Sequence, residues 1–289
     1  MASQPVIKQS FDHDLDQPDQ DKMRKQIELE RLFNKNQLLS RIRKEFTDCK
    51  DFNFTEYIRA RAIPIEFGLD VLVQMALHKR ATLPTLVGIM RPYFGDAQVT
   101  ADMLYKCAVA DLMDWDPKSE QFIVRFEISD DVQEELDLFQ FPLPMVVRPR
   151  RVTNNKQSGY VLGGGSLILR HNHHDDDICL DHINRANGIR FVIDHKTARM
   201  VKNQWRNLDK PKPGETKEDF NRRKKAFDKY DRNTKAVMDI LGESSEDFYL
   251  THKYDKRGRT YCQGYHITYQ GSPWNKAVIQ LVDKEIVDS

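Results

Sequence analysis

Apolar side chains recur at helical spacing in several stretches between residues 21 and 112, and this period constrains the fold more than any other feature of the sequence. Over 21–46 the apolar residues stand mostly three or four positions apart with charged residues between them, which predicts an amphipathic helix. Further helices are expected over 69–77, over 84–94, and from a Thr100 cap to about residue 112. The first half of the chain is therefore expected to be largely helical.

The helical period breaks between residues 112 and 128. A polar string, Asp-Pro-Lys-Ser at 116–119, stands between an apolar run and the alternating residues Phe122, Val124, Phe126 and Ile128. This pattern predicts a short β-hairpin, so the expected fold class is mainly α with small β elements (α+β). Three helices and a hairpin over about 66–128 could also form a winged helix.

Composition narrows the class of protein. The chain has 289 residues, 39% of them hydrophobic and 31% charged, with no apolar run close to the roughly 18 residues of a membrane span. Its four cysteines are far apart, which is typical of reduced thiols. We expect a protein without a membrane span or an export signal, and a flexible arm at 1–19, where aspartates stand among Gln and Pro.

Charge is distributed unevenly along the chain. Residues 1–140 hold 18 basic and 25 acidic side chains, whereas 141–289 hold 27 and 19. The most acidic part, 101–140, argues against an autonomous DNA binder there, because its 11 acidic residues would repel a phosphate backbone. The basic residues gather in 141–170, which has five and no acidic residue, and in 195–235, which has 14 against six. A helix over 215–241 is expected to expose a cationic face.

The string His-Asn-His-His-Asp-Asp-Asp at 171–177 suggests a metal site. Adjacent ligands cannot all converge on one ion, and no second cluster supplies the remaining ligands. We therefore expect no metal ligand in this chain. A metal-dependent nuclease that uses His173 and Asp176 stays as one alternative function.

Residues 248–281 contain the most specific motif. Two arginines that flank a glycine can reach adjacent phosphates, and a tyrosine ring nearby can stack on a base. The motif consists of Asp255, Arg257, Gly258, Arg259 and Tyr261, followed by Gln270, Gly271 and Lys276. It resembles the Asp-x-x-Gly-Arg motif of the phage and mitochondrial single-subunit DNA-directed RNA polymerases.

Upstream segments resemble the same family in the same order. Residues 141–165 are similar to its Pro-x-Val-Val-x-Pro segment and Gly-Gly-Gly turn, and 183–194 fits its next helix loosely. The ordered resemblance covers 84–289 and is strongest at the two ends of 141–281. It is closest to the small N-terminal subunit of the heterodimeric RNA polymerase of N-four-like bacteriophages, which implies a phage transcription protein in the cytoplasm of an infected bacterial host.

The resemblance implies a role for each part of the chain. In order, these parts are a helical N-terminal domain with a hairpin near 112–128 (20–140), a Gly-rich template-side connector (141–194), the thumb (195–247) and the start of the palm (248–289). The thumb helix would grip template DNA and the hybrid with nascent RNA through its charge. An apolar strand at 278–286 would complete its sheet with a partner.

The resemblance also implies which residues contact nucleic acid. Arg257, Arg259 and Tyr261 would contact template or hybrid, with Asp255 orienting their loop, and an intramolecular salt bridge is the alternative for these residues. The full set is Lys253, Asp255, Arg257, Gly258, Arg259, Tyr261, Lys276, Arg222, Arg223, Lys224, Gly164 and Arg170.

None of these residues is expected to be catalytic. Two-metal phosphoryl transfer needs carboxylates that hold two Mg²⁺ ions about 4 Å apart. The family's metal-binding aspartates follow the Lys276 region, and the sequence ends at Ser289 before them. A larger palm-and-fingers subunit would therefore supply Mg²⁺, and the complex would use ribonucleoside triphosphates, whereas the isolated chain is expected to be inactive.

The hairpin corresponds to the family's strand-separating hairpin, but it is short and its tip is Asp-Pro-Lys-Ser-Glu. We therefore expect single-stranded or premelted promoters, or an accessory single-stranded DNA-binding protein. The main alternative function is a non-enzymatic, winged-helix-like DNA-binding transcription regulator.

Overall fold

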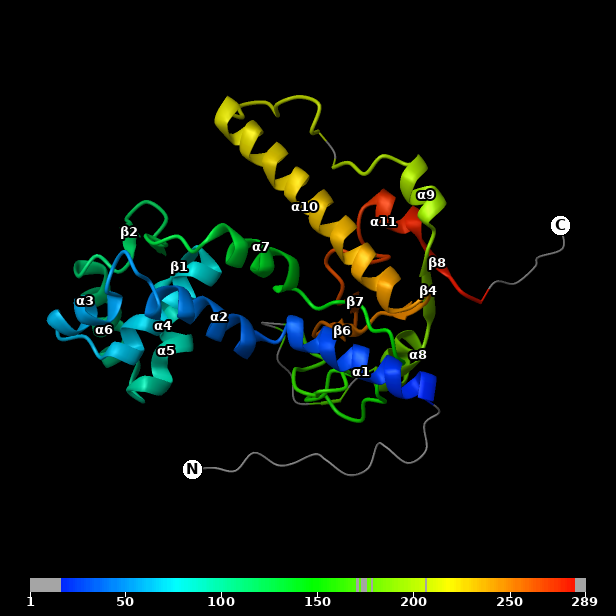
Figure 1. Ribbon diagram of the computed structural model, residues 1–289, viewed down its shortest axis with the longest axis horizontal. Coiled ribbons are helices and arrows are strands. Elements are labelled where there is room, and N and C mark those ends of the chain that lie inside the picture. The colour runs from blue at the N-terminus through cyan, green and yellow to red at the C-terminus, as the bar shows by residue number, and fades with distance from the viewer. Residues whose placement is uncertain (1–16, 170–171, 173–175, 178, 206, 284–289) are drawn as a thin grey trace. The chain divides into compact units, whose positions relative to one another are not determined.

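The computed structural model describes residues 17–283 except 170–171, 173–175, 178 and 206 (Figure 1). The regular secondary structure in the described part of the chain consists of helices and small antiparallel sheets, which confirms the mainly α, α+β fold class. Of the arm expected at 1–19, residues 1–16 lie outside the described part, and helix α1 begins at Gln17. No helix in the described part combines the length and apolarity that crossing a bilayer requires.

Contacts divide the chain into two units, one continuous (34–140) and one made of two segments (up to 33, and from 141 on). The helices of the 34–140 unit are α2 (Lys35–Thr47), α3 (Phe54–Ala60), α4 (Ile65–His78), α5 (Leu83–Met90), a 3₁₀ turn η1 (Arg91–Tyr93), α6 (Ala97–Val109) and α7 (Asp130–Phe139). Its strands are β1 (Arg80–Thr82), β2 (Asp114–Asp116) and β3 (Gln121–Ile123).

Helix α4 is the centre of the 34–140 unit. A helix that is apolar on all sides must be buried on all sides, and α4 is buried at nine of its residues. Its core residues Phe67 and Leu72 are inaccessible to solvent or nearly so, as is Ile58 of α3. Gly68 allows α3 to approach, because a Cβ atom at this position would lie 2.8 Å from the Ile58 side chain.

The predicted hairpin is present as β2 and β3, which pair with Trp115 opposite Phe122. The other edge of β3 pairs with β1, and all three strands run antiparallel in the order β1-β3-β2. The alternating pattern suggested a longer strand, but β3 ends at Ile123. The order α4, β1, α5, α6, β2, β3 is that of a winged helix, the arrangement that the sequence allowed over about 66–128.

Two helix boundaries differ from the sequence prediction. The single helix expected over 21–46 is two helices, because the chain leaves helical geometry at 33–34 between α1 and α2. The cap of α6 is Asp96 and not Thr100: its carboxylate accepts a hydrogen bond from the Val99 N–H group at 2.9 Å. The buried Thr100 hydroxyl instead donates to the Asp96 carbonyl oxygen at 2.6 Å.

The second unit contains α1 and all elements after residue 141 (Figure 1). Its helices are α1 (Gln17–Leu32), α8 (Leu180–Asn187), α9 (His195–Met200), α10 (Lys217–Ser244) and α11 (Pro273–Val278). Its strands are β4 (Arg190–Ile193), β5 (Phe248–Tyr249), β6 (His252–Tyr254), β7 (Thr260–Cys262) and β8 (Ile279–Leu281).

Helix α1 belongs to this unit because two of its buried polar side chains hydrogen-bond the segment that follows residue 141. The Gln26 side-chain oxygen accepts from the Val146 N–H group at 2.7 Å. The Glu30 carboxylate accepts from the Val161 and Leu162 N–H groups, each at 2.7 Å. The expected domain at 20–140 therefore differs from the contact-based unit, which begins at Asn34.

Prediction: Leu72→Ala lowers the free energy of unfolding of the 34–140 unit by about 2–5 kcal/mol, because a cavity remains in a core without access to water. Trp115 reports on this unit alone if Trp205 and Trp274 are replaced by Phe, so urea unfolding followed by fluorescence measures the change. The control Val99→Ala, at an exposed position, should change the free energy by less than about 0.5 kcal/mol. Equal effects of the two variants would contradict the assignment of this core.

Candidate nucleic-acid interface

The Asp-x-x-Gly-Arg motif forms the turn that joins β6 to β7. Lys253 pairs with Tyr261 across the two strands, and the Asp255 N–H group donates to the Arg259 carbonyl oxygen at 3.0 Å. The turn needs a left-handed residue, which Gly258 supplies with a φ of 79°. The spacing of the motif is thus first a requirement of the turn.

The Asp255 carboxylate is the hub of this turn. It accepts hydrogen bonds from the backbone N–H groups of Arg257 (2.9 Å) and Arg259 (3.1 Å) and from the Tyr261 hydroxyl (3.2 Å). Both guanidinium groups also donate to its Oδ2 atom, Arg257 through Nη2 at 2.9 Å and Arg259 through Nε at 2.8 Å. The intramolecular salt bridge that the sequence left as an alternative is therefore present in the structure.

These ion pairs leave the cationic groups open to solvent. The Asp255 side chain is 3% exposed, whereas those of Arg257 and Arg259 are 61% and 54% exposed. An arginine has five N–H donors, and Asp255 occupies two on each guanidinium group. The remaining donors can reach an outside anion while the carboxylate holds both side chains in place.

Electrostatics favour the ionised form of this cluster. Burial alone would raise the pKa of Asp255, but hydrogen bonds from Arg259 and Tyr261 outweigh burial and lower the pKa. The hydrogen bond that the Arg259 side chain donates to Asp255 raises the pKa of Arg259, although desolvation by itself would lower it. The turn therefore presents a net positive charge near neutral pH.

The Gly-rich segment lies directly beside this hairpin. The Tyr254 N–H group donates to the Leu167 carbonyl oxygen at 2.9 Å, and the Leu169 N–H group donates to the Tyr254 carbonyl oxygen at 3.0 Å. The buried Tyr254 hydroxyl donates to the Asn155 side chain. Backbone hydrogen bonds therefore hold the Gly-rich segment against the residue that precedes the Asp255 turn.

The three consecutive glycines form an open turn. Gly163, Gly164 and Gly165 have φ values of 73°, 80° and 81°, in the left-handed region that favours glycine. A Cβ atom at Gly164 would have no neighbour within 4 Å among the described residues. Arg170, the other predicted contact in this segment, lies outside the described part of the chain.

His252, the first residue of β6, has a buried side chain with two polar partners. Its Nδ1 atom lies 2.9 Å from the Asn187 side-chain oxygen and its Nε2 atom 2.8 Å from the Tyr269 hydroxyl. Burial, together with the nearby His182, lowers the pKa of His252 to about 4. The ring is therefore neutral at pH 7. No pattern in the sequence indicates this role of His252.

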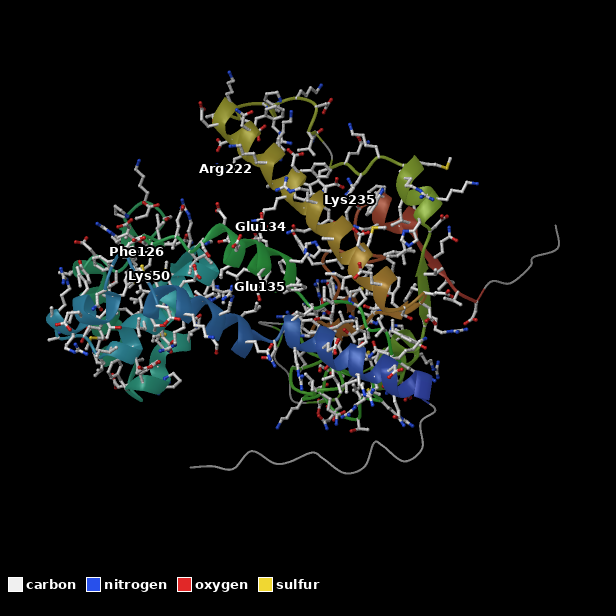
Figure 2. The ribbon with its side chains drawn as sticks, viewed as in Figure 1. Lys50, Phe126, Glu134, Glu135, Arg222 and Lys235 are labelled. Atoms are coloured by element: carbon white, nitrogen blue, oxygen red, sulfur yellow. The ribbon has the colours of Figure 1, made fainter. Side chains whose placement is uncertain are left out.

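Helix α10 presents its predicted basic residues in three different ways. Arg222 is highly exposed (Figure 2) and pairs with Asp219 in the preceding turn of the helix. Arg223 forms two hydrogen bonds with Glu215, at 2.9 and 2.7 Å, and is mostly buried. Lys224 is exposed, with its ammonium group 5.8 Å from the centre of the Phe220 ring.

The structure does not bring these α10 residues to the hairpin. Buried α10 residues all lie between Tyr230 and Leu241, and the N-terminal end of the helix extends away from β6 and β7 (Figure 1). Arg223 instead holds the start of the helix to the preceding loop. Lys276 is exposed on the short helix α11, outside the hairpin.

The described part of the His-Asp string stabilises a loop. The Asp177 carboxylate accepts from the Asn155 N–H group, and the Asp176 carbonyl oxygen accepts from the Asn155 side chain, each at 2.7 Å. His171, His173, His174 and Asp175 lie outside the described residues. Among the described residues, no group of three or more His, Cys, Asp or Glu side chains could hold a metal ion.

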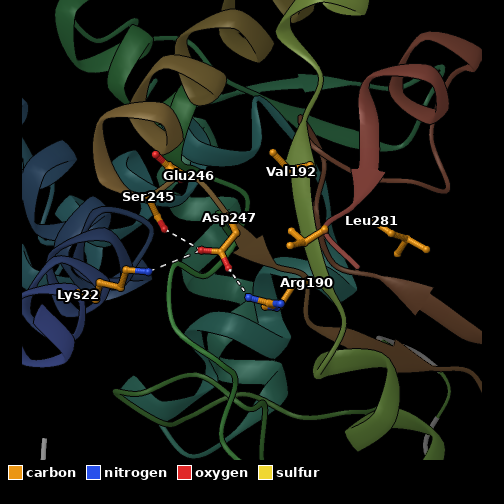
Figure 3. A pocket seen from close by; sticks show the side chains of 8 residues that line it. Lys22, Arg190, Val192, Ser245, Glu246, Asp247 and Leu281 are labelled. Carbon is orange, nitrogen blue, oxygen red and sulfur yellow. Dashed lines mark hydrogen bonds and ion pairs between the residues drawn. The ribbon is translucent and has the colours of Figure 1, made fainter. Parts of the chain in front are cut away.

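A cavity of about 700 Å³ lies between the C-terminal end of α10 and the β4–β8 strands (Figure 3). Asp247 is at its centre, 3.7 Å from the Lys22 ammonium group and 3.6 Å from an Arg190 guanidinium nitrogen. Leu281 of β8 is exposed at its rim. This cluster joins α1, the segment that follows α10, and β4, the middle strand of the sheet β5-β4-β8. No pattern in the sequence indicates it.

The comparisons with known proteins identify no family for this chain: no protein-family model matches it, and no curated protein matches it.

Prediction: acidification destabilises the second unit because His252 must become protonated. The pKa of His252 is about 4 when folded against about 6.5 when unfolded, so between these values the unfolded state binds more protons. Its contribution to stability is full above pH 6.5 and is lost progressively as the pH falls to about 4, by up to roughly 3 kcal/mol.

Urea unfolding at pH 4.5 and 7 measures this loss. His252→Gln should reduce the difference between the two pH values, whereas the control His195→Gln, at an exposed position on α9, should preserve it. An unchanged difference in His252→Gln would assign the acid sensitivity to another group.

Proposed function

We propose that this chain is a subunit of a heteromeric DNA-directed RNA polymerase that grips template DNA and the RNA–DNA hybrid. Metal-binding carboxylates for the chemical step would come from a partner subunit with the palm and fingers, which would bind Mg²⁺ and ribonucleoside triphosphates. The protein would act in phage transcription in the cytoplasm of an infected bacterial host. This proposal follows from the sequence resemblance together with the site geometry.

One observation supports the proposal above all others. The backbone of Tyr254 pairs with Leu167 and Leu169, which joins the Gly-rich segment to the Asp255 turn. A polymer that passes along this surface meets an open glycine turn and two guanidinium groups with free donors, which suits a phosphate backbone. Under this proposal, the 141–194 region is the template-side connector, 195–247 is the thumb and 248–289 is the start of the palm.

Strand β8 supports the need for a partner. The Val282 N–H group donates to the Arg190 carbonyl oxygen at 3.1 Å, so by the alternation of an antiparallel ladder the backbone carbonyl and N–H groups of Leu281 point away from β4. No strand in the described part of the chain pairs with this outer edge, and Leu281 is 51% exposed. We propose that a strand of the partner adds here. Residues 284–286 of the expected strand lie outside the described part.

A second candidate function, a DNA-binding regulator, is favoured by the winged-helix order of the 34–140 unit. In such folds the helix that precedes the hairpin, here α6, contacts DNA. The exposed residues of α6 include Val99, Tyr105 and Val109, and its Lys106 donates to the Ala62 carbonyl oxygen at 2.7 Å. These exposed apolar side chains, together with the exposed Asp102, fit a phosphate backbone poorly, so we rank this function second.

Prediction: Arg259→Ala weakens binding of the full chain to a single-stranded DNA oligonucleotide by about 1–3 kcal/mol, measured by fluorescence anisotropy. The matched control Arg24→Ala removes an exposed arginine that also pairs with an aspartate, and should leave the affinity unchanged. Equal losses in the two variants would point to non-specific charge attraction.

The variant Asp255→Asn separates preorganisation from bulk charge. It removes the one negative charge of the turn, so simple charge attraction would strengthen DNA binding. If the carboxylate positions both arginines, binding weakens instead, although the net charge of the turn has become more positive. Circular dichroism establishes that the variant is folded. Stronger binding by Asp255→Asn would remove the proposed role of Asp255.

Prediction: the chain alone incorporates no ribonucleotides, whereas its complex with the polypeptide encoded immediately downstream does so on single-stranded DNA. Leu281→Lys should abolish copurification of the two chains, because a charge on an edge strand opposes strand addition. The control Ile189→Lys, at an exposed position outside β8, should preserve it.

Two outcomes would contradict parts of this proposal. Polymerisation by the chain alone would refute the assignment of the metal-binding carboxylates to a partner subunit. Efficient initiation by the complex on linear duplex DNA would refute the need for premelted promoters.

A further inference from the structure

A cavity of about 250 Å³ lies within the loop that precedes the three glycines. Three basic side chains and glycine backbone line it, and none of the described residues in its lining is acidic. The lining residues are Arg150, Arg151, Val152, Lys156, Gln157, Ser158, Gly159, Tyr160, Gly163 and Gly164. Only Gly164 of these was expected from the sequence to contact nucleic acid.

Local hydrogen bonds fold this loop so that its cations face one space. The Arg150 N–H group donates to the Gly159 carbonyl oxygen at 2.8 Å, which closes the loop. Gly159 has a φ of 81°, and a Cβ atom there would lie 3.4 Å from Pro149 and 3.3 Å from Asn187. Within the loop, the Gln157 side-chain oxygen accepts from the Thr153 N–H group at 2.7 Å.

A buried hydroxyl in the wall of the cavity lacks a partner. Ser158 is 8% exposed, and its oxygen makes no hydrogen bond within the described residues. Such a group normally has a partner, because leaving it unpaired costs stability. The glycine turn lies against it: a Cβ atom at Gly165 would be 3.1 Å from the Ser158 Cβ atom.

Two carboxylates reach this segment, and both bind backbone N–H groups. Glu30 is 3% exposed and accepts from Val161 and Leu162 at 2.7 Å, and Asp177 accepts from Asn155. Their hydrogen bonds hold the loop in place before any ligand arrives. The side chains of Arg151 and Lys156 form no ion pair within the described part of the chain, so they are available to an external anion in a site that is already formed.

We propose that this cavity binds one phosphate group, through Arg151, Lys156 and the Ser158 hydroxyl. The source to which we assign it is a phosphodiester of a single nucleic-acid strand, because Leu162, 45% exposed, and the bare glycine turn leave room for the adjoining nucleotides. The assignment to a strand rests on the proposed function. Binding of a phosphate group as such does not.

The experiment uses the full chain with two probes. Isothermal titration calorimetry measures inorganic pyrophosphate, and fluorescence anisotropy measures a labelled single-stranded DNA 20-mer over a series of salt concentrations. The test variant is Arg151→Ala/Lys156→Ala, and the control Lys50→Ala/Lys118→Ala removes two exposed lysines of the 34–140 unit, of which Figure 2 labels Lys50. Arg259→Ala is measured in parallel.

We expect the test variant to bind both probes about tenfold more weakly, which corresponds to about 1.4 kcal/mol. Loss of one phosphate contact should reduce the slope of log K against log salt for single-stranded DNA by about 0.7. The control should change neither value. Ser158→Ala should weaken pyrophosphate binding about threefold without lowering the urea midpoint, since the hydroxyl makes no internal hydrogen bond.

Each remaining result is decisive. Unchanged binding of both probes by the test variant overturns the site, while a loss in Arg259→Ala alone leaves the proposed function standing. If the test variant binds pyrophosphate more weakly but single-stranded DNA as well as the wild type does, the cavity binds a free phosphate compound. That result overturns the assignment to a nucleic-acid strand. If the wild-type chain binds pyrophosphate through these residues but no DNA, the proposed function fails and the phosphate site remains.

Discussion

The candidate interface depends on one buried carboxylate. Asp255 is almost inaccessible to water, and such an ion is tolerated only where hydrogen bonds replace its hydration. Two backbone N–H groups, two guanidinium groups and a hydroxyl do so here. The carboxylate therefore fixes both the path of the turn and the direction of two arginines. The preceding residue, Tyr254, forms backbone hydrogen bonds with Leu167 and Leu169, so the Gly-rich segment is fixed to the same hairpin.

Local features of the fold followed from local sequence. The apolar surface of α4, the polar tip of the hairpin and the glycine at a left-handed turn are each determined by residues within a few positions of one another. The same holds for the capping Thr216 of α10, which accepts from the Asp219 N–H group at 3.1 Å. Prediction failed locally at the start of α6, where Thr100 was expected to cap the helix and Asp96 does so instead.

Long-range polar contacts did not follow from the sequence. Nothing near Gln26 or Glu30 indicates that their partners lie beyond residue 141, and a period of apolar residues says nothing of a buried carboxylate. For the same reason, a count of charges in α10 could not show that Arg222 is exposed whereas Arg223 is mostly buried in an ion pair with Glu215. Charge composition predicts a basic surface, but pairing decides which cations remain available to a ligand.

The division of the second unit into two segments has a consequence for its synthesis. The 34–140 unit contains its own core and can fold as soon as it leaves the ribosome. Helix α1 is made earlier, but the Gln26 and Glu30 contacts span 120 and 131 residues, so its buried side chains stay without their partners until the loop at 146–162 emerges. Until then the nascent helix exposes a surface that a chaperone could bind, and a pause in translation before residue 141 would prolong this exposure.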